Sequence, residues 1–117
     1  LFRSIVNISS VSGQTGNFGQ VNYAAAKAGL HGFSMSLARE VARKGVTVNS
    51  VSPGYVETPM TRAMPDEVRE RTVASVPVGR IGQPADIARA VAFLTADDAG
   101  YITGANVPVN GGLFMSF

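Results

Sequence analysis

Two short runs of β-branched and apolar residues flank one long helical pattern, and this order restricts the possible folds more than any other feature. The runs are SIVNI at residues 4–8 and VTVNSV at residues 46–51, and each is typical of a buried strand. Between them, over residues 23–43, apolar side chains recur at helical spacing: Ala26, Leu30, Phe33, Leu37 and Val41. The second strand follows this helix with almost no loop. The two strands are therefore predicted to be parallel, with the helix crossing between them.

The second half of the sequence continues the same alternation after Pro53-Gly54 breaks the second strand. Residues 55–77 have a weak pattern, with short helices predicted from Thr58-Pro59 and over residues 66–73, as in a lid above the sheet. A helix opens at PAD, residues 84–86, and its predicted apolar face is Ile87, Ala88, Val91, Ala92 and Leu94. A third strand over residues 106–110 ends at Gly111-Gly112. The fold class predicted by this order is α/β with a parallel sheet.

Local signals suggest where the first helix begins and ends. Residues 12–20 are rich in Gly, Asn and Gln and are predicted to be a loop, with Asn22 as the N-cap and Gly45 as the C-cap. Three strands alone would leave an edge without a neighbour. The sequence also opens on Leu1, in the middle of a strand pattern. We therefore expect part of the domain to lie outside these 117 residues.

Composition excludes several classes of function. The chain has no cysteine, which rules out disulfides and thiolate sites and fits a cytoplasmic protein. Its 10 basic residues are scattered, so no nucleic-acid surface is expected. No apolar run approaches the length of a membrane span. Asp97-Asp98 is typical of a solvated turn, and no metal site is predicted.

Three residues carry the chemistry that the sequence suggests. Tyr23 and Lys27 lie four residues apart in YAAAK, so a helix places both on one face. An ammonium beside a phenol favours the phenolate, and a nearby hydroxyl can hold a carbonyl oxygen. Ser10 follows the first strand, at the end of the sheet where open α/β folds place their sites. Together these groups predict a proton donor directed at a ketone, half of a carbonyl reductase.

Four segments in a fixed order carry a resemblance to a known family: NISSVSG, GQVNYAAAKAG, VNSVSPGYVET and YITGANVPVNGG. Over residues 1–117 the chain resembles the C-terminal half of a short-chain dehydrogenase/reductase. The resemblance implies one partial domain, the C-terminal portion of a Rossmann-type doubly wound parallel sheet. It also implies that the N-terminal cofactor-binding half, with its glycine-rich turn, is missing.

The same resemblance assigns roles to positions of this sequence. Ser10 would orient the substrate carbonyl, Tyr23 would be the general acid, and Lys27 would assist Tyr23 and bind the nicotinamide ribose. The expected contacts of the nicotinamide cofactor are Tyr23, Lys27, Pro53, Gly54, Val56 and Thr58. Three flanking residues are candidate walls of an acyl pocket, with ordinary loop packing as the alternative: Phe18, Gln20 and Tyr55.

Within the family the chain is most similar to enzymes that reduce 3-oxoacyl thioesters, and LHGF and VSPGY favour the acetoacetyl-CoA branch. The expected reaction is NADPH-dependent reduction of acetoacetyl-CoA to the 3-hydroxyacyl thioester, with NADH left open. Alternatives are reduction of 3-oxoacyl groups on acyl carrier protein, another ketone such as a sugar, polyol or steroid, or a non-catalytic partner subunit. Arg69 and Arg80 are candidates for phosphate contacts, with surface solvation as the alternative. A homotetramer of the full-length protein is expected.

Overall fold

Three parallel strands form the centre of the structure, a computed structural model that describes residues 3–116 of the chain. The strands are β1 (Arg3–Ile8), β2 (Val46–Pro53) and β3 (Asn106–Val109), in the order β1-β2-β3. Ile5 pairs with Val48 in the first ladder, and Val51 pairs with Val107 in the second. The parallel α/β fold predicted from the sequence is confirmed.

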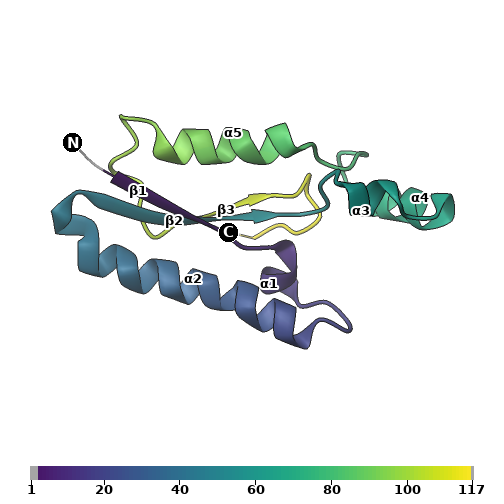
Figure 1. Cartoon of the computed structure of the whole chain (residues 1–117), viewed down its shortest axis with the longest axis horizontal. Coiled ribbons are helices and arrows are strands. Elements are labelled where there is room, and N and C mark those ends of the chain that lie inside the picture. Colours follow the sequence, from purple (N-terminus) through teal and green to yellow (C-terminus); the bar gives the residue numbers. More distant parts are fainter. Residues whose placement is uncertain (1–2, 117) are drawn as a thin grey trace.

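Two long helices cover opposite faces of this sheet (Figure 1). One is α2 (Val21–Val41), which continues into the 3₁₀ turn η1 (Ala42–Lys44) before β2 begins. The other is α5 (Pro84–Thr95), between β2 and β3 in sequence. Gly45 has a φ of 73°, the left-handed conformation that a glycine adopts easily at the end of a helix. The core between the helices and the sheet contains Val48, Val51 and Leu94, all fully buried.

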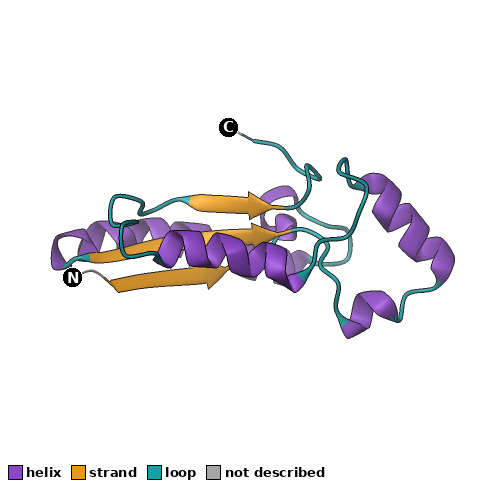
Figure 2. Cartoon of the chain, turned by 90° about the horizontal axis from the view of Figure 1, so that it is seen from above, coloured by secondary structure: helices purple, strands orange, loops and turns teal. Residues whose placement is uncertain are grey.

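The segment between β2 and α5 leaves the body of the fold beyond the C-terminal ends of the strands (Figure 2). It contains α3 (Pro59–Arg62) and α4 (Asp66–Ser75), and both predicted short helices are confirmed. A parallel bridge between Val56 and Gly82 closes its base, with the Glu57 amide donating to the Gly82 carbonyl at 2.7 Å. We call residues 57–81 the lid.

The start of α2 differs from the sequence prediction. Part of the predicted loop over residues 12–20 is a short helix, α1 (Val11–Thr15), and α2 begins at Val21 after Gln20. Asn22 therefore lies inside the helix and is not its N-cap. Gly13 explains why α1 can form here. A Cβ at Gly13 would lie 2.8 Å from the Ala28 nitrogen, so only glycine allows α1 to touch the backbone of α2.

The helix faces and the first strand also depart from the predicted burial. On α2, Ala26 and Phe33 are exposed, and the fully buried positions are the small residues Ser34 and Ala38. On α5, two alanines of the predicted apolar face are exposed: Ala88 and Ala92. β1 lies at the edge of the sheet, so Ile5 and Ile8 remain 41% and 43% exposed rather than buried.

Within residues 3–116, none of the helices is both long and apolar enough to cross a bilayer.

Candidate active site

Ser10 lies where β1 ends and α1 begins. Its backbone is extended, and its Oγ accepts a hydrogen bond from the Ser12 amide at 3.1 Å, which caps α1. This contact uses a lone pair and not the hydroxyl proton. Among residues 3–116 no acceptor for that proton is found within hydrogen-bonding distance. The hydroxyl is thus held by its oxygen and can still donate.

Tyr23 and Lys27 occupy the first two turns of α2, on the face that meets the end of β1. The Lys27 Nζ lies 5.7 Å from the centre of the Tyr23 ring and donates a hydrogen bond to the Ile8 carbonyl at 2.9 Å. The Ser9 Oγ donates to the Lys27 carbonyl at 2.7 Å. These bonds tie the helix to the strand end that carries Ser10. The predicted proximity of phenol and ammonium is therefore present.

The end of β2 forms the opposite side of the site. The Gly54 amide donates to the Val109 carbonyl at 3.0 Å, and a Cβ at Gly54 would lie 2.8 Å from the Cβ of Asn110. Only glycine therefore allows the β2 and β3 ends to approach this closely. Thr58, four residues further on, caps α3 through its Oγ1, which accepts from the Thr61 amide.

These groups share one cavity of about 920 Å³, a volume suited to a sizeable ligand. All predicted catalytic and nicotinamide-contacting residues line it: Ser10, Tyr23, Lys27, Pro53, Gly54, Val56 and Thr58. Residues separated by almost fifty positions thus meet at the C-terminal edge of the sheet, where ligands bind in open α/β folds.

A smaller cavity of about 460 Å³ adjoins the first through shared lining residues. Ser10, Tyr23 and Tyr55 line both cavities, and Gln20 lines the smaller one. The Gln20 Oε1 accepts from the Asn17 side-chain amide at 2.9 Å, which holds it at this wall. Phe18 lines neither cavity, and its side chain is fully exposed. The structure therefore offers no support for the predicted place of Phe18 in the acyl pocket.

One wall of the large cavity was not predicted from the sequence. It is formed by the exposed face of α5 and the residue that opens it: Pro84, Ile87, Ala88, Val91 and Ala92. The apolar periodicity of α5 identified this face but did not indicate that part of it lines a cavity. Small alanines on an apolar helix stripe were the available signal, because they let a ligand approach the helix closely.

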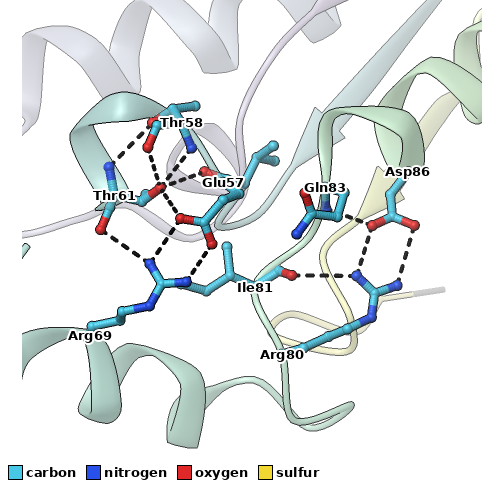
Figure 3. A network of polar contacts seen from close by, with 9 residues as sticks. Glu57, Thr58, Thr61, Arg69, Arg80, Ile81, Gln83 and Asp86 are labelled. Carbon is cyan, nitrogen blue, oxygen red and sulfur yellow. Dashed lines mark hydrogen bonds and ion pairs between the residues drawn. The ribbon is translucent and has the colours of Figure 1, made fainter. Parts of the chain in front are cut away.

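The lid contains a partly buried ion pair, shown in Figure 3. Glu57 is 8% exposed, and the Arg69 guanidinium donates to both of its carboxylate oxygens. The Thr61 hydroxyl lies 3.2 Å from the same carboxylate. The pKa of Glu57 is lowered, chiefly by the hydrogen bond from Arg69. The contact joins the base of the lid to α4 and occupies the guanidinium that was a candidate phosphate ligand.

A second ion pair closes the lid where it returns to α5 (Figure 3). The Arg80 Nη1 lies 2.8 Å from the Asp86 carboxylate, which also accepts from the Gln83 amide at 2.7 Å. The hydrogen bond from Arg80, followed by the one from Gln83, lowers the pKa of Asp86 to about 2. Arg80 is thus also engaged within the chain.

Comparison with known proteins adds to this geometry. A family model described as enoyl-(acyl carrier protein) reductase matches residues 3–114. An acetoacetyl-CoA reductase of Allochromatium vinosum is 64% identical over 114 residues, which are 97% of this chain and 46% of that protein. The 3-oxoacyl-(acyl-carrier-protein) reductase FabG of Haemophilus influenzae is 58% identical over 98% of this chain and 48% of its own length. A (3R)-3-hydroxyacyl-CoA dehydrogenase of Mus musculus is 54% identical over 96% of this chain and 43% of its own length.

The chain spans about half the length of the curated relatives it matches.

Proposed function

Since the chain belongs to the short-chain dehydrogenase/reductase family, we propose that its site serves the NADPH-dependent reduction of a 3-oxoacyl thioester, such as acetoacetyl-CoA, to the 3-hydroxyacyl thioester. The observation that carries this proposal is the single cavity lined by Ser10, Tyr23 and Lys27 together with the end of β2. The names of relatives that act on acyl-CoA and on acyl-carrier-protein substrates support it.

In this proposal, two hydroxyl groups and one ammonium group each have a separate role in reducing the ketone. The uncommitted proton of Ser10 donates to the carbonyl oxygen and orients it. Tyr23 gives its phenolic proton to the same oxygen as negative charge develops there. The Lys27 ammonium, 5.7 Å from the Tyr23 ring centre, stabilises the phenolate that remains. General-acid help of this kind is worth roughly 10²- to 10⁴-fold in rate, and positioning supplies a further large factor.

The residues at the end of β2 fit a flat nicotinamide ring. Gly54 presents backbone without a side chain, Val56 and Pro53 offer apolar wall, and the Thr58 hydroxyl accepts from the Thr61 amide and retains its proton to donate. The bound cofactor supplies the hydride. The role of Pro53, Gly54, Val56 and Thr58 is to hold it on the β2 side of the cavity, while Tyr23 and Lys27 reach it from α2. NADPH is proposed over NADH on the resemblance alone.

The smaller cavity suits the acyl thioester. Tyr55 provides an apolar wall next to Ser10 and Tyr23, and Gln20 can hydrogen-bond the thioester or 3-oxo oxygen. Coenzyme A is the proposed carrier of the acyl group. Acyl carrier protein is the second candidate, favoured by the similarity to 3-oxoacyl-(acyl-carrier-protein) reductases.

We further propose that this chain is the catalytic half of a domain whose other half binds the rest of the cofactor. The relatives are about twice as long as this chain, and the unpaired edge of β1 leaves Ile5 and Ile8 exposed. In that assembly, a cytoplasmic homotetramer is proposed, with α2 and the Gly111-Gly112 end as contact surfaces. The 117 residues alone are then expected to give no useful turnover.

A substrate panel tests the reductase proposal. The chain, joined to its cofactor-binding half, is assayed with acetoacetyl-CoA, 3-oxoacyl carrier protein, and sugar, polyol and steroid ketones, each with NADPH and NADH. Highest kcat/KM for acetoacetyl-CoA with NADPH is expected. Preference for a sugar or steroid ketone would contradict the proposed substrate class. Failure to bind either nicotinamide cofactor would contradict the proposal that the protein is an enzyme and would favour a non-catalytic partner subunit.

A further inference from the structure

The face of α2 that packs on the sheet carries polar side chains among its apolar ones, with Ser34 buried beside Ala38 and His31 half-buried. Its buried contacts include two side-chain hydrogen bonds across the layer. The Asn7 amide donates to the Ser34 Oγ at 3.0 Å, and the His31 Nε2 lies 3.2 Å from the Ser52 Oγ. Ser34 and Ser52 are 1% and 0% exposed, so both bonds end on buried hydroxyl groups. These directional bonds, in addition to apolar packing, oppose movement of α2 along the sheet.

The direction of the His31 bond follows from the protons available. Ser52 has one hydroxyl proton, which it donates to the Asn106 Oδ1 at 2.8 Å. Ser50 donates to the same oxygen at 2.9 Å. The Ser52 oxygen can then only accept from His31, so His31 carries its proton on Nε2. A chain of donated hydrogen bonds runs from α2 through β2 to β3.

This bond joins the two sides of the catalytic cavity. His31 lies four residues, about one helical turn, after Lys27, and Ser52 immediately precedes Pro53-Gly54. A shift of α2 along the sheet would move Tyr23 and Lys27 together relative to the end of β2. The bond opposes such a shift from inside the layer, on the same helix face as Lys27.

We propose that His31 is a positioning residue, which through Ser52 fixes the placement of Tyr23 and Lys27 against the nicotinamide-binding end of β2. The inference rests on the proposed reductase function. His31 itself lines neither of the two cavities at the site and touches no reacting atom. It therefore acts on the rate of the chemical step and not on the affinity for the ketone.

The test compares variants of the chain joined to its cofactor-binding half. His31→Leu removes the donor at similar size, and His31→Gln restores an N–H near the position of Nε2. Ser52→Ala removes the acceptor from the other side and serves if His31→Leu folds poorly. Ser36→Ala, on the exposed side of α2, is the matched control. Each variant is measured for kcat and KM with acetoacetyl-CoA and for the NMR shifts of the Tyr23 ring.

His31→Leu and Ser52→Ala are each expected to lower kcat by about tenfold, since small misplacements are costly in rate, with KM for acetoacetyl-CoA within about twofold. The double variant is expected to lose no more kcat than Ser52→Ala alone, because both substitutions remove the same His31–Ser52 bond. His31→Gln and Ser36→Ala should stay within about twofold of the unmodified protein. Equal loss in His31→Gln and His31→Leu, additive losses in the double variant, or unchanged kcat in both single variants would overturn the proposal.

The NMR arm separates this proposal from the reductase function. If the unmodified protein reduces no 3-oxoacyl thioester, the proposed function fails, but the Tyr23 ring shifts still report its placement. Displaced Tyr23 shifts in His31→Leu and Ser52→Ala, restored in His31→Gln, support positioning. Tyr23 shifts identical in every variant contradict it.

Discussion

At the scale of single residues, the hydroxyl group of Ser10 is proposed to have two roles. Its oxygen accepts the Ser12 amide and so starts α1, while its proton stays available for a substrate oxygen. The proposed carbonyl-holding group is therefore oriented by the helix that it caps. No separate element is needed to fix its rotamer.

Replacing Ser10 tests this double use. Ser10→Ala is expected to lower kcat by about 10²-fold, the usual effect of removing one donor to a developing oxyanion. It should also cost about 1 kcal/mol of stability through the lost cap. Ser10→Thr keeps the hydroxyl and is the control. Steady-state kinetics and urea unfolding measure both effects, and an alanine variant with full kcat would remove Ser10 from the mechanism.

Elements come together through backbone contacts that only glycine permits. A Cβ at Gly13 would lie 2.8 Å from the Ala28 nitrogen and the Lys27 carbonyl carbon, both backbone atoms that cannot easily move. Gly13→Ala is expected to destabilise the protein by about 1–3 kcal/mol through overpacking. Gly32→Ala is the matched control. Apart from its chain neighbours and its own helix backbone, no atom lies within 4 Å of its Cβ position, so Gly32→Ala should raise the free energy of unfolding by roughly 0.5–1 kcal/mol. If urea unfolding shows that the free energy of unfolding changes in the same direction in both variants, the proposed close packing at Gly13 is contradicted.

The Glu57–Arg69 pair makes the lid one unit, and removing the charge should loosen it. Glu57 is 8% exposed, and Glu57→Gln leaves the Arg69 guanidinium facing a neutral amide at this position. Amide hydrogen exchange in α3 and α4 is expected to accelerate on the order of tenfold, while β1–β3 stay unchanged. Glu67→Gln, exposed in the first turn of α4, controls for charge alone. Unchanged exchange in both helices would show that the pair does not hold the lid.

The Arg80–Asp86 pair, where the lid returns to α5, is expected to make the stability of the protein depend on pH. The pKa of Asp86 in the folded protein is about 2, below the ordinary 3.8, because Arg80 and the Gln83 amide hydrogen-bond the carboxylate. A lowered pKa means that the added stability is complete above about pH 4 and is lost as the pH falls toward 2. The difference in unfolding free energy between the unmodified protein and Asp86→Asn should be constant at higher pH and shrink through this window. An exposed-site control is Asp98→Asn, and a difference independent of pH would contradict the assignment.

Strand positions and the lid helices were predictable because short β-branched runs and proline starts are local signals. The position of Tyr23 beside Lys27 was predictable for the same reason, since helical spacing alone fixes it. The polar contacts of α2 with the sheet were not predictable, because apolar periodicity cannot detect a bond such as His31 to Ser52, 21 residues apart. The same apolar periodicity included Ala26 and Phe33, which are exposed in the structure. α1 was missed because it packs against α2 at Gly13, a tertiary contact that local sequence signals do not show.

At the scale of the whole molecule, the sheet brings three separate segments to one edge. The end of β1 delivers Ser10, α2 returns Tyr23 and Lys27 to it, and the end of β2 supplies the facing wall. Lid residues Thr58 and Thr61 and one face of α5 line other parts of the cavity. The unpaired side of β1, with its exposed isoleucines, is where we propose that the cofactor-binding half continues the sheet.

The central proposal is that this cavity protonates a ketone through Tyr23, and one comparison tests it most directly. Tyr23→Phe is made in the chain joined to its cofactor-binding half, with Tyr101→Phe, fully exposed, as the control. Reduction of acetoacetyl-CoA by NADPH is followed alongside NADPH binding. We predict that Tyr23→Phe lowers kcat by roughly 10²- to 10⁴-fold with NADPH affinity preserved, while Tyr101→Phe behaves as the unmodified protein. Full turnover by Tyr23→Phe would contradict the proposed role of the phenol and, with it, the proposed chemistry of the site.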